Sequence, residues 1–446
     1  MDAKPAASLR ASPRPARAVA AGLALLCAAV AATGVAWQAW DMFGPKHRPM
    51  LQGWDDSFYY FWLPSVVIDH DLDFSNQLAH SGTVDAAARD AGLAQPRTAT
   101  GLLPNKYPPG WALASLPFFL AAHAATPAGA TGFEPGYLLT VWAGQLLYAA
   151  AGLWLTVKLV ARLVPGAPAA AVVLAGWLAS PLIYYQTARV AMCHSLVFTL
   201  AMSVFWLALR IADGDRRAHV WVALGFCGAL LVVTRNVVVV YLVFPAVVLA
   251  PRLRSLKAAA WLALGAAGPV AVQLVAWKLL FGSWLVYSYG GERFDFAHLH
   301  VADVLFSPRH GWFYWHPLLL VGVAAFAVWA WRRREGRAGL AALGAILLLN
   351  AAWPAWWLGS SFGHRGFEVA TFFALLGLAV LWRAAAARPA WRRALTAVVT
   401  LAVAWNLVLG TLFLTRRIPP EAAVTYADAG RALAGWFTGP ANDLRR

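Results

Sequence analysis

The sequence is a succession of apolar runs separated by short polar or basic segments. The runs cover residues 18–40, 110–126, 135–157, 167–188, 192–210, 218–234, 236–250, 258–281, 314–331, 338–357, 366–382 and 393–414. Most of them approach or exceed the roughly 20 residues that a helix needs to cross a bilayer. The pattern therefore predicts an all-α polytopic integral membrane protein.

Short basic clusters between the runs indicate which runs cross the membrane, because Lys and Arg in short loops stay cytoplasmic. If 110–126 is a re-entrant or surface-lying helix, every cluster from Lys158 to Arg393 lies on the same side as the N-terminus. If that run spans, these clusters lie outside. The first arrangement places 20 of the 36 Lys and Arg residues inside. We therefore expect about 11 transmembrane helices, with the N-terminus inside and the C-terminus outside, while the path of 110–126 stays open.

Composition supports this class of protein. Hydrophobic residues make up 61% of the 446-residue chain and charged residues only 13%, against about 25% charged in soluble globular domains. The net charge of +16 comes from clusters scattered between the apolar runs rather than from one basic patch. Soluble, disordered and fibrous classes are excluded, and no nucleic-acid partner is expected.

The chain divides into three parts. A cytoplasmic tail covers residues 1–17, a transmembrane domain covers 18–415, and an outer tail covers 416–446. The run at 18–40 exceeds the length of a signal-peptide core, so we expect a retained first helix, with cleavage as the alternative. The transmembrane domain carries a long first outer loop, 41–109, with interfacial helices, and a second outer loop, 282–313.

The first outer loop holds the densest group of polar residues, including eight of the 20 acids. Asp55 and Asp56 open it, and an aromatic stretch containing Tyr59 and Tyr60 follows, which suits the membrane interface. Adjacent carboxylates beside an apolar surface are suited to act as a general base near neutral pH. A solvated acidic turn is the alternative.

Asp69, Asp71 and Asp73 alternate further along this loop. An EF-hand would need Gly and Glu where Phe74 and His80 stand, so that calcium site is excluded. A looser site for a divalent metal ion, using one or two of these acids, is an alternative to a structural role in anchoring the loop. No other cofactor is indicated, since the chain has no nucleotide-binding fingerprint.

Cationic and histidine side chains recur near the outer ends of the runs. Lys106 lies in the stiff Lys-Tyr-Pro-Pro-Gly segment, where each Pro fixes φ, and could face an anionic head group or simply snorkel. An Arg at the membrane surface usually faces a cavity or an anionic partner. Three arginines are therefore candidate phosphate contacts: Arg235 at the tip of a tight hairpin formed by 218–250, and Arg309 and Arg365 in Gly- and Ser-containing segments.

Three histidines accompany these cations: His194, His310 and His364. They are candidate substrate-binding residues together with Tyr59 and Tyr60. The alternatives are core packing for His194 and helix-end anchoring for the segments that contain Arg309 and Arg365. Acids from one loop and cations from several would suit a reaction in which a carboxylate removes a proton from a hydroxyl while cations stabilise a departing phosphate.

The order of these motifs resembles membrane glycosyltransferases of the GT-C superfamily. The similarity is to the bacterial dolichyl-phosphate-mannose–protein mannosyltransferase and aminoarabinose transferase type. It rests on Asp55-Asp56 with Tyr59-Tyr60, on 69–74, on 106–110, on 306–312 and on 360–365. Trp356-Trp357 is followed by Leu358, so the Trp-Trp-Asp signature of oligosaccharyltransferases is absent.

The resemblance implies an inverting glycosyltransferase, a hexosyl- or pentosyltransferase, with its site on the outer face of the cytoplasmic (inner) membrane of a bacterium. The donor would be a polyprenyl-phosphate-linked sugar, and the acceptor a cell-envelope glycan, lipid or protein hydroxyl. The family's base corresponds to Asp55, with Asp56 as the alternate.

Two other functions would predict different sequence patterns. A transporter or lipid-carrier flippase would predict paired half-repeats with interrupted helices, but the chain shows no repeat and its polar residues gather on one side. A ligase or polymerase acting on diphosphate-linked glycans would place its key residues in a large late outer loop, whereas here the largest outer loop is the first.

Overall fold

The computed structural model describes residues 53–80 and 86–438, together with 22, 28–30, 32–36 and 51. All regular elements in these residues are helices and none is a strand, which confirms the predicted all-α class. The predicted cytoplasmic tail 1–17 and the end of the chain after Thr438 lie outside the described residues, as does most of the predicted first helix.

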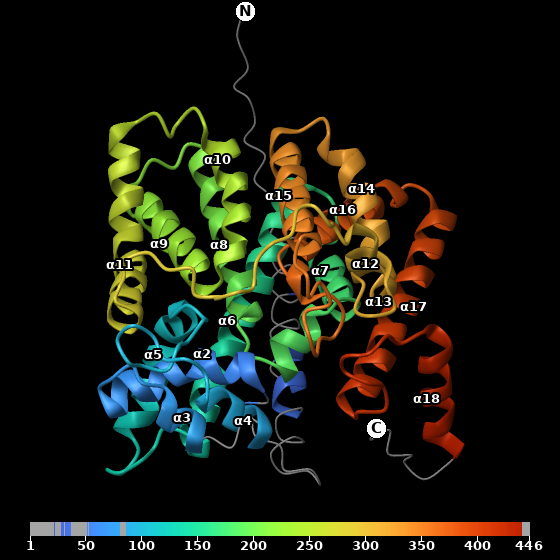
Figure 1. Ribbon diagram of the computed structural model, residues 1–446. Coiled ribbons are helices and arrows are strands. Elements are labelled where there is room, and N and C mark those ends of the chain that lie inside the picture. The colour runs from blue at the N-terminus through green and yellow to red at the C-terminus, as the bar shows by residue number, and fades with distance from the viewer. Residues whose placement is uncertain are drawn as a thin grey trace, which may run out of the picture.

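Ten helices of 7 to 29 residues form the body of the part of the molecule that the structure describes (Figure 1). They are α6 (Pro135–Leu163), α7 (Ala169–Leu178), α8 (His194–Ala212), α9 (Ala218–Thr234), α10 (Val243–Leu249), α11 (Leu256–Phe281), α14 (Pro317–Ala330), α15 (Arg334–Ala351), α16 (Thr371–Ala385) and α17 (Pro389–Leu414). Short irregular helices interrupt them: η2 (Tyr184–Ala188), η3 (Asn236–Leu242) and η4 (Arg365–Phe367).

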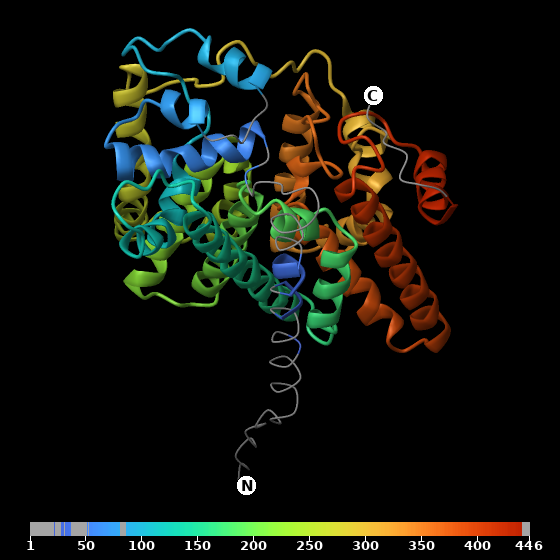
Figure 2. The same cartoon turned by 90° about the horizontal axis from the view of Figure 1, so that it is seen from below.

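The described part of the first outer loop and the apolar run that follows it, 110–126, fold as a layer of short helices at one end of this body. The layer contains α2 (Trp54–Pro64), η1 (Ser65–Asp69), α3 (Ser75–His80), α4 (Ala86–Leu93) and α5 (Gly110–Ala124). Seen from that end, α2 to α5 cover one half of the molecule, and α17 and α18 (Tyr426–Thr438) lie in the other half (Figure 2). The second outer loop runs from α11 across the front of the body to α12 (Val301–Phe306) and α13 (Trp312–Trp315) (Figure 1).

Four of the described helices, α6, α8, α11 and α17, are long and apolar enough to cross a membrane. Six described apolar segments are shorter, namely α5, α7, α9, the continuous η3–α10 segment, α14 and α16. The count of about 11 spans remains a prediction. The run at 110–126 forms the 15-residue α5, which is shorter than the roughly 20 residues of a typical span.

The run from 218 to 250 forms two arms that meet at Arg235, as the expected hairpin requires. Arg235 has extended backbone angles and ends α9, and the 3₁₀ helix η3 and then α10 form the return arm. Arg252 beyond α10 donates a hydrogen bond of 2.9 Å to the carbonyl of Ala212 at the end of α8. The two basic clusters at 210–217 and 252–257 therefore lie at the same end of the body, and Arg235 lies at the other.

The layer of the first outer loop packs directly on this hairpin. A Cβ atom added to Gly110 would lie 2.4 Å from the carbonyl oxygen of Val233 and 2.6 Å from the nitrogen of Thr234. Only a residue without Cβ permits this approach between two backbones. Gly110 therefore sets the distance between the start of α5, just after Lys106 and Tyr107, and the end of α9, just before Arg235.

Candidate active site

A cavity of about 670 Å³ lies between the first outer loop, the hairpin tip and the second outer loop. Its lining includes six of the residues predicted from sequence: Asp55, Tyr59, Lys106, His194, Arg235 and Arg365. Aliphatic side chains on η3 and α15, such as Val239 and Leu349, continue the lining. The cavity therefore joins a charged region to an apolar one.

Asp55 is the carboxylate of α2 that faces the cavity. It lies in the first turn of the helix, where the helix dipole favours negative charge. Its Oδ1 accepts a hydrogen bond of 2.5 Å from the Tyr107 hydroxyl, and its Oδ2 lies 2.7 Å from Nη2 of Arg365. Burial alone would raise the pKa of the Asp55 carboxyl, but the Arg365 guanidinium and the Tyr107 hydroxyl outweigh burial and hold that pKa below its usual range.

Tyr107 keeps its proton in this arrangement. Burial, together with the negative charge of Asp55, raises the pKa of the Tyr107 hydroxyl well above its usual value. The hydroxyl therefore remains a hydrogen-bond donor to Asp55 at neutral pH. Tyr107 belongs to the stiff segment 106–110, and its sequence context alone does not indicate this contact.

Asp56 faces the opposite way. It is fully buried, and its Oδ2 lies 2.9 Å from Nη2 of Arg189, whose side chain is 11% exposed. Asp56 is not among the residues that line the cavity. Of the two candidate bases, the structure thus brings only Asp55 into contact with the cavity.

The two tyrosines predicted to bind substrate also lie on different sides of α2. Tyr59 lines the cavity. Tyr60 is buried on another side of α2, where its hydroxyl donates to the carbonyl of Gly132. Because Tyr60 faces the packing between α2 and the start of α6, its position corresponds to a structural residue.

Three cations reach the cavity, and each has a carboxylate partner. Arg365 pairs with Asp55, and Arg235 Nη1 lies 2.8 Å from Oε1 of Glu368. Lys106 Nζ lies 2.6 Å from Oε1 of Glu292 in the second outer loop. Each positive charge of the cavity lining is therefore balanced by an adjacent negative charge.

Arg309, the fourth predicted phosphate contact, lies elsewhere. Its guanidinium carbon is 3.9 Å from the ring centre of Trp357, and its Nε donates a hydrogen bond of 2.7 Å to the carbonyl of Glu421. It does not line the cavity. This geometry matches the alternative expectation of anchoring, here between the second outer loop and the C-terminal segment.

The three predicted histidines also differ in whether they line the cavity. His194 lines the cavity, whereas His310 and His364 are fully buried outside the lining. His310 has φ 65°, and its Nδ1 lies 2.9 Å from the carbonyl oxygen of Trp357. His364 Nδ1 accepts from the amide of Gly366, which caps η4 beside Arg365. These two histidines shape the loops around the site.

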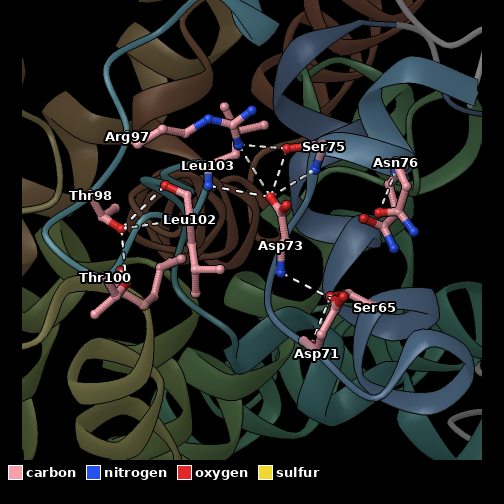
Figure 3. Close-up of polar contacts among 12 residues, drawn as sticks. Ser65, Asp71, Asp73, Ser75, Asn76, Arg97, Thr98, Thr100, Leu102 and Leu103 are labelled. Atoms are coloured by element: carbon pink, nitrogen blue, oxygen red, sulfur yellow. Dashed lines mark hydrogen bonds and ion pairs between the residues drawn. The ribbon is translucent and has the colours of Figure 1, made fainter.

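The acids at 69–73 anchor the first outer loop (Figure 3). Asp73 Oδ1 accepts from the amide and hydroxyl of Ser75, from the amide of Leu103 and from Nη1 of Arg97. Asp71 Oδ1 accepts from the Ser65 hydroxyl, and Asp69 Oδ2 from side-chain amides of α3. These hydrogen bonds and the ion pair are the contacts expected of acids that anchor the loop, and the looser metal site stays an untested alternative.

Glu368 is the functional candidate that sequence analysis missed. It is 2% exposed and lies between Arg235 and His194. A signal was present, because Glu368 is the sole acid within the apolar run 366–382, and ionisable residues inside such runs are usually functional. Glu292 and Tyr289 of the second outer loop were also missed, and both line the cavity.

No protein-family model matches the chain, and no curated protein matches its sequence. Among solved structures, it is similar to ArnT from Cupriavidus metallidurans in the apo state, at 16% identity and a TM-score of 0.49 over 94% of this chain and 78% of ArnT. ArnT bound to undecaprenyl phosphate gives 14% identity and a TM-score of 0.47, over 96% of this chain and 76% of that one.

The archaeal oligosaccharyltransferase AglB from Archaeoglobus fulgidus, in complex with an inhibitory peptide and a dolichol-phosphate, is 12% identical with a TM-score of 0.50. The match covers 92% of this chain, which spans 56% of the length of AglB. This likeness is one of fold: the chain shares its helical architecture with an oligosaccharyltransferase.

Proposed function

We propose that the protein is an inverting glycosyltransferase that moves a sugar from a polyprenyl-phosphate carrier to a cell-envelope acceptor on the outer face of the bacterial cytoplasmic membrane. The observation that carries the proposal is that Asp55 meets three cations, Lys106, Arg235 and Arg365, in a single cavity, whose other carboxylate, Glu292, is paired with Lys106. The fold, shared with an oligosaccharyltransferase in complex with a dolichol-phosphate, supports the same class of donor.

The chemistry follows from these groups. Asp55 takes the proton of an acceptor hydroxyl, whose oxygen attacks the anomeric carbon from the face opposite the phosphate. The bond between the anomeric carbon and the phosphate oxygen breaks, and the polyprenyl phosphate leaves with the bonding electrons. Lys106, Arg235 and Arg365 stabilise the charge that develops on the phosphate.

Donor binding would also prepare the base. In the ligand-free site Arg365 pairs with Asp55 and lowers the pKa of its carboxyl. A donor phosphate that draws Arg365 away would remove this stabilisation, so the pKa of Asp55 would rise towards its usual value. Asp55 would thus become a stronger base when the donor is in place.

The apolar part of the cavity suits the carrier. Val237 and Val239 on η3, Trp277 on α11 and Leu349 on α15 belong to its lining, and an isoprenoid chain gains free energy by burial against such side chains. The volume of about 670 Å³ lies within the range of roughly 300–1,000 Å³ that is usual for small-molecule sites.

The test uses the protein in lipid nanodiscs with a panel of radiolabelled polyprenyl-monophosphate sugars. Transfer to cell-envelope extract is followed for the wild type, for Asp55→Asn and for Asp213→Asn, which alters an exposed ion pair with Arg162 remote from the cavity. We expect turnover of one donor by the wild type and Asp213→Asn, and its loss in Asp55→Asn. If the wild type turns over no donor, the proposal fails and a lipid-flipping assay tests the transporter alternative.

A further inference from the structure

Glu368 contacts two residues that line the cavity, although Glu368 itself does not line it. Its Oε1 lies 2.8 Å from Nη1 of Arg235, and its Oε2 lies 3.7 Å from Nδ1 of His194. Each partner comes from a different element, Arg235 from the break between α9 and η3 and His194 from the start of α8. The carboxylate thus joins two elements from behind the cavity wall.

Burial favours a single geometry for the contact between Glu368 and Arg235. Glu368 is 2% exposed, and the Arg235 side chain is 15% exposed. A long arginine side chain in a partly open cavity has many rotamers, and ordering it costs conformational entropy. A charge-assisted hydrogen bond to a buried carboxylate offsets that cost and selects one orientation.

Arg235 retains capacity for a ligand in this orientation. A guanidinium has five N–H donors, and the bond to Glu368 uses Nη1. Arg235 also belongs to the cavity lining. The same side chain can therefore be held from behind by Glu368 and present other donors to a phosphate.

The local sequence links the two arginines of the site. Arg365 begins the 3₁₀ turn η4, and Glu368 follows that turn directly. Arg365 reaches Asp55, whereas Glu368 reaches Arg235. This turn therefore positions both guanidinium groups. It carries Arg365 itself, and it holds Arg235 through Glu368.

We propose that Glu368 is a positioning residue that holds Arg235 in the orientation needed to bind the donor phosphate. The inference rests on the proposed function, because it takes a polyprenyl phosphate as the ligand. Glu368 acts through Arg235 and does not contact the reacting atoms. A carboxylate that merely neutralised buried charge would stabilise the fold without this dependence on Arg235.

A double-mutant cycle separates these two roles. The probe is undecaprenyl phosphate in nanodiscs, and its binding is followed by tryptophan fluorescence for the wild type, Glu368→Gln, Arg235→Gln and the double variant. We expect each single variant to weaken binding about tenfold. The double variant should bind no more weakly than Arg235→Gln alone, because Glu368 would have nothing left to position.

Two further variants control for folding. Glu368→Asp keeps the charge and should recover part of the affinity, and Asp213→Asn, remote from the cavity, should bind as the wild type does. Thermal midpoints of the ligand-free proteins report whether each variant folds. If Glu368→Gln does not fold, the comparison of Glu368→Asp with and without Arg235→Gln gives the same cycle.

The outcomes distinguish the two proposals. Wild-type affinity in Glu368→Gln, or losses that multiply in the double variant, would overturn the positioning role and leave the glycosyltransferase proposal intact. Absence of undecaprenyl phosphate binding by the wild type would overturn both. Loss of affinity in the single variants with no further loss in the double variant would establish the role.

Discussion

Asp55 and Asp56 are neighbours in sequence, but their carboxylates meet different arginines. Asp55 lies 2.7 Å from Arg365 in the cavity, and Asp56 lies 2.9 Å from Arg189 in the protein interior. The first turn of α2 thus turns one carboxylate towards the cavity and pairs the other with Arg189, which directly follows η2. This division leads to opposite expectations for two otherwise identical substitutions.

Asp55→Asn should abolish most sugar transfer with little effect on stability. Loss of a general base typically slows a reaction by about 10²–10⁴-fold. The Arg365 side chain is itself 17% exposed, so it keeps access to solvent. The measurement compares the rate of transfer from a polyprenyl-phosphate sugar with the thermal midpoint of the same preparation.

Asp56→Asn should act mainly on stability. It leaves the buried guanidinium of Arg189 with a neutral partner, and breaking a buried pair from one side costs about 3–5 kcal/mol of unfolding free energy. Thermal unfolding in nanodiscs measures this change. A stable Asp56→Asn protein without activity, beside an active Asp55→Asn protein, would reverse the assignment of the base.

Tyr107→Phe should move the acid limb of the pH–rate profile to higher pH. The folded-state pKa of Asp55 is lowered, so the wild-type base stays ionised until the pH falls below the usual aspartate range. Removal of the Tyr107 hydroxyl removes a hydrogen bond to the ionised form and raises the pKa of Asp55. The profile of kcat/KM between about pH 3 and 8 measures the shift.

The lowered pKa of Asp55 also makes the stability of the fold depend on pH. A lowered folded-state pKa means that ionised Asp55 stabilises the fold above its unfolded-state pKa, and that this contribution disappears as the pH falls through the folded-state value. Tyr107→Phe raises the folded-state pKa, so it should make this contribution smaller and its loss complete at higher pH. Tyr148→Phe is the matched control, because its hydroxyl donates to the carbonyl of Ala114 away from the cavity. Equal profiles for all three proteins would contradict the prediction.

Gly110→Ala should reduce both stability and transfer. The added methyl group would meet the backbone of Val233 and Thr234, which has to move away, and such overpacking typically costs about 1–3 kcal/mol. The displacement would separate the Lys106–Tyr107 segment from Arg235. The measurements are the thermal midpoint and the affinity for undecaprenyl phosphate.

Gly136→Ala provides the control for this substitution. A Cβ atom at Gly136 would meet no atom within 4 Å, and alanine has the higher helix propensity. Gly136→Ala should therefore equal or exceed the wild type in stability. Similar behaviour of the two variants would show that the approach of α5 to α9 does not matter for the site.

Asp73→Ala should loosen the first outer loop. It removes the acceptor for two hydrogen bonds from Ser75 and for one each from Leu103 and Arg97, with an expected cost of about 1–2 kcal/mol at this partly exposed position. Hydrogen exchange of the Ser75 and Leu103 amides measures the change. Asp90→Ala, which alters an exposed pair with Arg89, should leave both amides protected; equal exchange in both variants would remove the anchoring role.

The helical class, the hairpin at 218–250 and much of the site could be predicted from the sequence. Asp55, Lys106, Arg235 and Arg365 are polar residues that border apolar runs, where each charge needs a partner or a cavity. Because burial of an unpaired charge is costly, a charged residue at the border of an apolar run can be recognised from the sequence as a functional candidate. Their meeting in one cavity agrees with the expectation that acids from one loop face cations from several others.

The sequence could not predict which candidate residues line the cavity, because that depends on the direction of each side chain. Asp56 and Tyr60 differ from Asp55 and Tyr59 only in the face of α2 that they occupy, which adjacent positions in a sequence do not reveal. Arg309 looks like Arg365 in its local sequence, but it stacks on Trp357. Long-range pairs such as Lys106–Glu292 depend on how distant segments meet.

The change from α to 3₁₀ helix at Arg235 also fixes how deep the site can lie. The 17 residues of α9 are about 25 Å long, and the seven residues of η3 with the seven of α10 give a return arm of about 24 Å, because a 3₁₀ helix rises more per residue. Both arms are shorter than the roughly 30 Å hydrocarbon thickness of a bilayer. In the proposed membrane orientation, the bilayer would thin beside the hairpin, or the donor phosphate would descend below the plane of its neighbours to reach Arg235.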